Sequence, residues 1–127
     1  MSELNAATCE PLRSSPVSVE RPIDLVHLAR MTLGERSLER EVLELFDSQA
    51  SVLLARMRRA GIAGVPALAH TLKGSARAIG ATRVAQAAEA IEIATPADDA
   101  DLSLALADLD AAIEEARAFI ADLLRAH

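Results

Sequence analysis

Apolar residues near the C-terminal end of the chain recur at steps that alternate between four and three. The series is Leu102, Leu106, Leu109, Ile113, Ala116, Ile120 and Leu123. Such steps keep one side of an α-helix apolar along its length, and they are typical of helices that pack lengthwise against other helices. We therefore expect residues from about 101 to 126 to form one long helix of a helical bundle.

The apolar residues of the whole chain are mostly those that favour helices. Its 127 residues include 27 Ala and 18 Leu, against 7 Val, 7 Ile, 2 Phe and no Tyr or Trp. Ala and Leu are strong helix formers, whereas β-branched and aromatic residues favour strands. The fold class that we predict is all-α.

Glycine and proline positions divide the rest of the chain into further helices. Asp24 suits the N-cap of a short helix that Gly34 ends, and Gly80 suits the end of another. Between them, Gly61 and Gly64 interrupt the helical pattern. The helices predicted in this way cover residues of about 24–34, 37–60, 65–79 and, from about 82, a stretch that stops before a turn at 95–99.

Four long helices with short links most simply form an antiparallel four-helix bundle, with the short N-terminal helix as a cover. An intermolecular coiled coil through the last helix is the alternative. Because the other long helices also have apolar faces to bury, we favour a single bundle and a monomer. The apolar stripe predicted for the 37–60 helix consists of Leu38, Val42, Leu45, Phe46, Val52, Leu53 and Met57.

Residues 1–22 hold three prolines and no helical period, so we expect a disordered tail there and one bundle domain over residues 23–127. Cys9 lies in this tail, and as the single cysteine it allows no internal disulfide and no thiolate metal cluster. No apolar run approaches the roughly 18 residues of a membrane span and no secretory signal opens the chain, so a cytoplasmic protein is expected. The net charge of −6 and the lack of aromatic platforms argue against general nucleic-acid binding.

His70 departs from the apolar pattern of its helix. At about 100° per residue, the apolar residues from Val65 to Ile79 share one side, and His70 falls roughly 160° from the centre of that side. We therefore expect His70 to be exposed. On its own, an exposed histidine among charged residues indicates only a solvated surface.

Three features around His70 indicate more than that. Gly74 lies one turn further on, where glycine costs roughly 1 kcal/mol relative to alanine, and its missing side chain leaves room for another protein's active site to close over the imidazole. Lys73 and Arg77 place positive charge on the same strip, which suits an anionic group on the ring. Such charge also attracts an acidic partner. Residues 48–88 contain no acidic residue and six basic ones: Arg56, Arg58, Arg59, Lys73, Arg77 and Arg83.

An exposed imidazole is a nucleophile that can carry a phosphoryl group, because near neutral pH it has an unprotonated nitrogen available for attack. The stretch His70-Thr71-Leu72-Lys73-Gly74-Ser75, followed by Ile79-Gly80-Ala81, closely resembles the histidine-containing phosphotransfer (HPt) domains of multistep two-component phosphorelays. The helices from about Asp24 to the C-terminus also fit that family's bundle, and the tail lies outside the resemblance.

The resemblance implies a role for each residue of the motif. It makes His70 the phosphoryl acceptor and donor, with Lys73 and Arg77 as electrostatic support. Gly74 then provides clearance, and Ser75 is a small flanking residue that hydrogen-bonds near the site.

The resemblance also implies the partners, which are response-regulator receiver domains, often fused to a hybrid histidine kinase. It indicates a phosphoryl carrier rather than an enzyme, without a cofactor, since the sequence has no glycine-rich phosphate loop for ATP. Sensor kinases differ, because an acidic residue and a proline typically follow their histidine, whereas Thr71 follows here. Ile62 and Val65 are candidates for apolar contacts with a partner, and core packing is the alternative.

Gln49 lies in the centre of the 37–60 stripe, where an amide needs a hydrogen-bond partner. We predict that it accepts a hydrogen bond from the His70 imidazole and fixes the ring. The alternative is a bond to a backbone carbonyl or a water.

A metal site and a helical adaptor are the alternatives to a phosphoryl carrier. A metal site on His27, His70 and His127 lacks any ligand spacing. A helical adaptor that docks on signalling partners without phosphoryl chemistry is the main alternative, but we would expect such an adaptor to lose the histidine. Substitution of His70 distinguishes the two, because only the carrier depends on it.

Overall fold

Residues in the left-handed conformation follow the first two helices of this chain. The structure, a computed structural model, describes residues 21–126, which form α2 (Leu25–Met31), α3 (Arg36–Ile79), α4 (Thr82–Ile93) and α5 (Asp99–Ala126). Gly80 caps α3 in the left-handed conformation that glycine adopts without strain, as predicted. Thr32 caps α2, and Leu33 and the predicted Gly34 follow it, both with positive φ. No strand occurs among the described residues, so the all-α prediction is confirmed.

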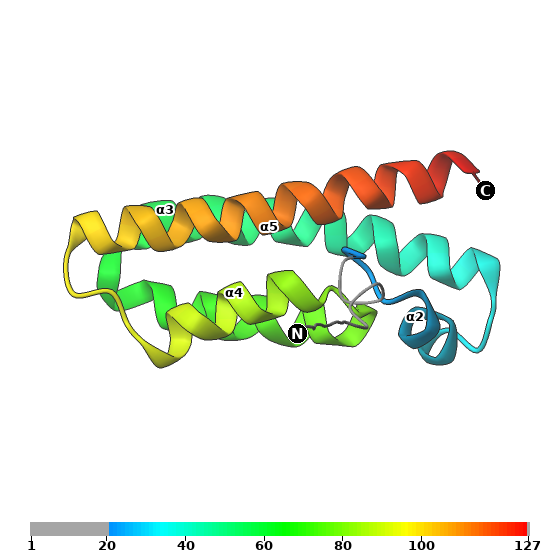
Figure 1. Cartoon of the computed structure of the whole chain (residues 1–127), viewed down its shortest axis with the longest axis horizontal. Helices are drawn as coiled ribbons and strands as arrows, with labels where there is room; N and C mark the ends of the chain where they lie inside the picture. Colours follow the sequence, from blue (N-terminus) through cyan, green and yellow to red (C-terminus); the bar gives the residue numbers. More distant parts are fainter. Residues whose placement is uncertain (1–20, 127) are drawn as a thin grey trace, which may run out of the picture.

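The segment α3 consists of two helices joined at Gly61. There φ is 73° and ψ is 178°, values outside the helical range, and the chain reverses its direction (Figure 1). We call residues 36–60 the first arm and residues 62–79 the second arm. The two arms, α4 and α5 alternate in direction and form the predicted antiparallel four-helix bundle (Figure 1). Gly64, predicted to interrupt the pattern as well, lies inside the second arm.

The short helix α2 is fixed to the last turn of the second arm. The Asp24 side chain caps α2, as predicted, by accepting a hydrogen bond from the His27 backbone N–H at 3.1 Å. The Asp24 backbone N–H donates to the Gly80 carbonyl at 2.8 Å, and Nε2 of His27 bonds the Ala78 carbonyl at 3.0 Å. The predicted cover helix is therefore held at the end of the arm that carries His70.

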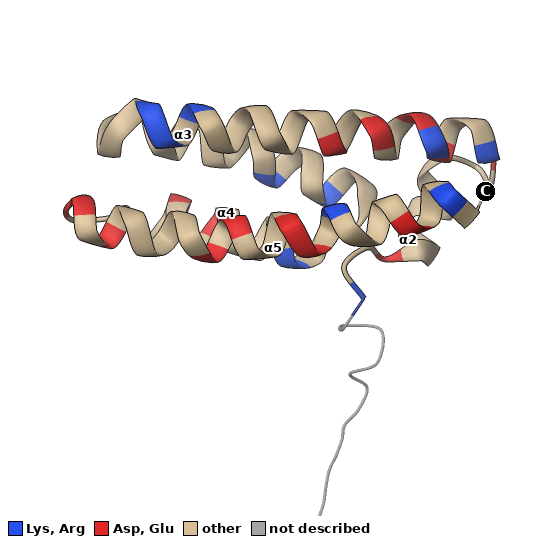
Figure 2. Ribbon diagram, turned by 90° about the horizontal axis from the view of Figure 1, so that it is seen from above, with Lys and Arg blue, Asp and Glu red and all other residues tan. Residues whose placement is uncertain are grey.

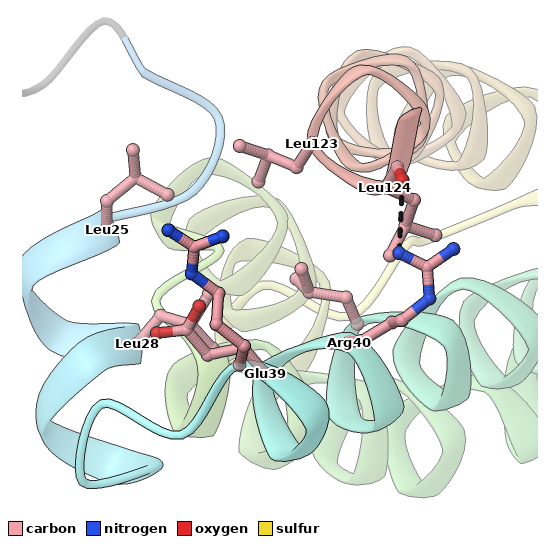
Figure 3. A pocket seen from close by; sticks show the side chains of 8 residues that line it. Leu25, Leu28, Glu39, Arg40, Leu123 and Leu124 are labelled. Carbon is pink, nitrogen blue, oxygen red and sulfur yellow. Dashed lines mark hydrogen bonds between the residues drawn. The ribbon is translucent and has the colours of Figure 1, made fainter. Parts of the chain in front are cut away.

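A cavity of about 210 Å³ lies between α2, the start of the first arm and the end of α5. Arg40 donates to the Leu124 carbonyl at 3.1 Å and ties the first arm to the last turns of α5 (Figure 3). The apolar part of the lining consists of Leu25, Leu28, Leu43, Leu123 and Leu124. Leu28 lines the cavity but is itself buried in the core, so α2 is attached both through this side chain and through its contacts with the second arm.

The core confirms the helical spacing of the first arm but not every residue of its predicted stripe. Leu45 and Val52, which we expected to be buried, are 68% and 56% exposed, and Leu38 is exposed as well. The prediction was wrong for these three because the first arm has apolar residues on two adjacent sides, and spacing alone does not tell which side faces the bundle. The buried residues are Leu43, Phe46, Ala50, Leu53, Leu54 and Met57.

Part of the sequence-based prediction lies outside the described residues. This applies to Cys9, to His127 and to all of the predicted tail except Arg21 and Pro22. Ile23, the next residue, is completely buried. Among the described helices, none combines the length and the apolar character needed to cross a membrane.

Gly80→Ala tests how α2 is attached. We expect this change to lower the free energy of unfolding by roughly 3 kcal/mol, because φ is positive and the new Cβ would lie 2.9 Å from the Asp24 carbonyl oxygen. Gly34→Ala is the matched control, since its φ is also positive but its Cβ would meet nothing within 4 Å, and it should cost about 1 kcal/mol. Urea denaturation followed by circular dichroism measures both, and equal losses would contradict the role of Gly80.

Candidate functional site

His70 lies on the outward side of the second arm, opposite the residues that pack into the bundle. Its side chain is 67% exposed, as the helical spacing predicts. The buried residues of the same arm are Val65, Ala69, Leu72, Ala76 and Ile79. The imidazole is therefore accessible to a group on another protein.

Small side chains lie on one side of His70. Ala67, Thr71, Gly74 and Ala78 are all exposed and lie within about 100° of His70 around the helix. A Cβ built on Gly74 would meet no heavy atom within 4 Å, so the fold itself does not require glycine there. The space that the missing side chain leaves is open to solvent beside the imidazole.

Glu92 of α4 contacts the other side of His70. Its Oε2 lies 2.5 Å from His70 Nδ1, and its Oε1 lies 2.5 Å from Nζ of Lys73, whose side chain is only 14% exposed. One carboxylate thus bridges the imidazole and an ammonium group. The Lys73 ammonium holds the pKa of Glu92 below its ordinary value, partial burial opposes this shift, and the His70 ring adds to it.

This bridge determines which ring nitrogen of His70 is free. Because an ionised carboxylate only accepts hydrogen bonds, Nδ1 of His70 carries a proton and donates it to Glu92. In the neutral ring Nε2 then keeps its lone pair. Since the pKa of Glu92 is lowered by folding, the bridge stabilises the fold above the pKa of an unfolded glutamate, and this contribution is lost as the pH falls through the lowered value.

Lys73 and Arg77 lie beside His70 as predicted, but each has an acidic partner. Arg77 donates to the Glu89 carboxylate at 3.1 Å, one turn before the Glu92 bridge on α4. The positive charge that the sequence places along this strip is therefore compensated within the chain. Lys73 acts on Glu92 and is not a free cation.

Ion pairs with α5 also compensate the positive charge of other residues in the basic run at residues 48–88. Arg58 pairs with Asp110 at 2.9 Å, and Arg83 pairs with Glu115 at 2.7 Å. Both acidic residues belong to α5, and Figure 2 shows acidic segments along α4 and α5. The local excess of positive charge expected from the sequence is much smaller in the folded protein.

Gln49 and Ser75 are half-buried and line a shallow groove of about 190 Å³ between the two arms and α2. No hydrogen bond joins Gln49 to His70, so the predicted contact is wrong, and Glu92 occupies that role. Gln49 lines the same groove as Ser75, and Ser75 lies about 140° around the second arm from His70. Gln49 and His70 therefore face different sides of this helix. The other residues that line the groove are Met31, Val42, Leu45, Phe46, Ala78 and Ile79.

Other candidates from the sequence belong to the scaffold. Val65 is completely buried in the core, which leaves the half-buried Ile62 as the accessible member of that pair. His27 bonds the Ala78 carbonyl at the end of the second arm. Within residues 21–126, no group of three or more His, Cys, Asp and Glu side chains is arranged to hold a metal ion.

Glu92 is the site residue that the sequence reasoning missed. It lies 22 positions after His70, on a different helix. A signal was present, because Glu89 and Glu92 are the acidic residues of α4 and lie three positions apart, close to the four positions between Lys73 and Arg77. Complementary charges at such spacing on consecutive antiparallel helices indicate that the two faces pack together.

An exposed imidazole that is held through one ring nitrogen on a helical bundle has the chemistry to take up a phosphoryl group on the other nitrogen. The family model described as Hpt domain matches residues 41–123, and the chain belongs to this family. Hpt domains are phosphocarrier modules of phosphorelay signalling and interact with receiver domains and kinases. Neither the curated proteins nor the solved structures gave a match.

Glu92→Ala tests the bridge to the imidazole. In the wild type we expect the neutral His70 ring to carry its proton on Nδ1, and without the carboxylate the ring should shift toward the form protonated on Nε2. The ¹⁵N chemical shifts of the two ring nitrogens measure this change at mildly alkaline pH.

Glu89→Ala is the matched control for that experiment. It removes the partner of Arg77 one turn away on the same helix and should leave the His70 ring unchanged. Identical His70 shifts in the wild type and in Glu92→Ala would mean that the carboxylate does not hold the ring in solution.

Proposed function

We propose that this protein is a histidine phosphotransfer protein that accepts a phosphoryl group from a receiver-domain aspartate on His70 and passes it to another receiver domain. The observation that carries the proposal is the state of the imidazole, which is exposed, bound through Nδ1 to Glu92 and open at Nε2. A carrier needs a nucleophile presented in a fixed orientation, and the docked receiver domain supplies most of the remaining groups.

The accepting step begins when the Nε2 lone pair of His70 attacks the phosphorus of the aspartyl phosphate. The N–P bond forms while the P–O bond to the aspartate breaks, and the aspartate leaves as a carboxylate. The proton on Nδ1 stays in place, so the phosphorylated ring is positively charged beside Glu92, which stabilises it.

The donating step uses the same arrangement in reverse. A carboxylate of the next receiver domain attacks the phosphorus, the N–P bond breaks, and the ring of His70 leaves as a neutral imidazole. Because Nδ1 keeps its proton throughout, no proton has to move within this protein. Such a carrier works in either direction, and the receiver domains on each side decide the net flow.

Glu92 and Lys73 act as positioning residues in this proposal. Glu92 fixes the ring and selects the nitrogen that reacts. Lys73 holds one carboxylate oxygen of Glu92, which leaves the other oxygen for His70. The electrostatic support that the family resemblance assigns to Lys73 is thus exerted through Glu92.

The receiver domain docks on the outward side of the two arms, which we call the docking face and define by Leu45, Val52, His70 and Gly74. Leu45 and Val52 are large apolar side chains left exposed, and exposed apolar groups near a reactive residue are typical of contact surfaces. The groove that contains Gln49 and Ser75 borders this face. A partner of this kind accounts for the apolar residues on the outward side of the first arm.

The phosphoryl donor in this proposal is a phosphorylated protein and not ATP. The sequence contains no glycine-rich phosphate loop, and a carrier needs no cofactor of its own. The donors and acceptors are response-regulator receiver domains, including one carried by a hybrid histidine kinase, and the carrier acts as a monomer.

His70→Gln should abolish labelling of this protein by phosphorylated receiver domains. The wild type and the variant are incubated with a panel of such domains, and the acid-labile adduct is located by mass spectrometry under neutral conditions. His27→Gln is the matched control, because it changes a histidine that contacts the Ala78 carbonyl, and it should be labelled like the wild type.

Each outcome of this experiment is informative. Label on His70 of the wild type, absent from His70→Gln, supports the carrier. Receiver domains that bind without labelling would favour the helical adaptor instead. An absence of both binding and labelling across the panel would count against both functions.

Gly74→Ala should separate stability from transfer. Alanine fits the helix there without a clash and should stabilise the fold by roughly 1 kcal/mol. The added methyl group narrows the space beside the imidazole, so we expect transfer from a receiver domain to slow by about tenfold or more. Thermal unfolding and transfer kinetics measure the two effects, and unchanged transfer would remove Gly74 from the docking face.

A further inference from the structure

Arg56 and Arg59 are the members of the basic run at residues 48–88 that have no acidic partner. Both are exposed, and neither forms an ion pair or a hydrogen bond with another described residue. The other four pair as Arg58–Asp110, Lys73–Glu92, Arg77–Glu89 and Arg83–Glu115. Acidic residues thus compensate the positive charge of four side chains in this run, and the guanidinium groups of the other two are open to solvent.

Both arginines lie on the docking face. They follow Val52 at steps of four and three, so Leu45, Val52, Arg56 and Arg59 fall within about 60° of one another around the first arm. Arg58 points to a different side, where it meets Asp110 of α5. The free arginines therefore share their side of the helix with the exposed apolar residues and not with the ion pairs.

The antiparallel course of the two arms brings Arg56 close to His70. Gln49 of the first arm and Ser75 of the second line the same groove at its end nearest the kink, and placing them level gives the alignment of the arms. Arg56 then lies level with about residue 68, within roughly 3 Å of His70 along the helix axis, while the two axes are about 8–10 Å apart. Figure 2 shows basic segments of α3 at its kinked end.

We propose that Arg56 and Arg59 select the partner by binding acidic side chains of the docked receiver domain. This inference rests on the proposed function and specifies the surface charge of the partner. Next to His70, the charges of Lys73 and Arg77 are already compensated by α4, so Arg56 and Arg59 supply the uncompensated charge that a partner meets there. A receiver domain with carboxylates facing the kinked end of α3 is favoured over one without them.

Charges of this kind act mainly on the rate of association and are weakened by salt. For Arg56→Gln/Arg59→Gln, we expect the second-order rate constant of phosphoryl transfer from a receiver domain with an acidic surface to fall about tenfold at low salt. The difference from the wild type should disappear at about 0.5 M salt. The rate of transfer within the saturated complex should not change, because neither arginine touches the imidazole.

The matched control is Arg58→Gln/Arg125→Gln, which removes the same charge from side chains that pair with Asp110 and Asp122 away from the docking face. It should change the rate constant less than twofold. Receiver domains with and without acidic surfaces are compared in parallel, and the loss should be confined to the acidic ones. Circular dichroism checks that all variants are folded.

Several results would overturn the inference while the proposed function stands. These are an equal loss in the two double variants, an equal loss for all receiver domains, or no loss at all, each with wild-type His70 labelled. Absence of label on wild-type His70 is the distinct result in which the proposed function fails, and this inference fails with it.

Discussion

The packing of the second arm of α3 against α4 positions His70, the side chain that we propose carries the phosphoryl group. Buried alanines line both helices, with Ala69 and Ala76 on α3 and Ala85 and Ala88 on α4. Because small side chains allow helix axes to approach closely, a carboxylate of α4 reaches the outward side of the second arm. At this separation Glu92 contacts both His70 and Lys73. Larger residues at the interface would separate the two helices and leave the imidazole unsupported.

The two sides of His70 differ: one side contacts charged groups of α4, and the other side is open to a partner. On the side of α4, charged groups of the chain fix the ring through Nδ1. On the other side, Gly74 and its small neighbours leave open space. This division suits the proposed carrier, in which the ring stays fixed while the phosphoryl group is transferred and the docked receiver domain supplies the catalytic groups.

The surface charge of the folded protein differs from the charge that the sequence suggests. The run at residues 48–88 has six basic and no acidic residues, which suggests a strongly positive surface. Acidic residues from later in the chain compensate most of that charge, and the remainder lies at Arg56 and Arg59 beside the kink. In the proposed complex, the uncompensated positive charge that a receiver domain meets is therefore concentrated at one end of the docking face.

The sequence by itself determined the helices, their glycine ends and the exposure of His70, because these depend on local backbone preferences and on the spacing of apolar residues along one helix. It also determined the phosphotransfer motif. Only the tertiary structure decided which helix faces which, since spacing describes the sides of a helix but not their neighbours. That is why Glu92 replaced Gln49 as the partner of the imidazole, and why Leu45 and Val52 are exposed. An ion pair between residues on separate helices depends on their packing distance and rotation, and these are properties of the assembled bundle.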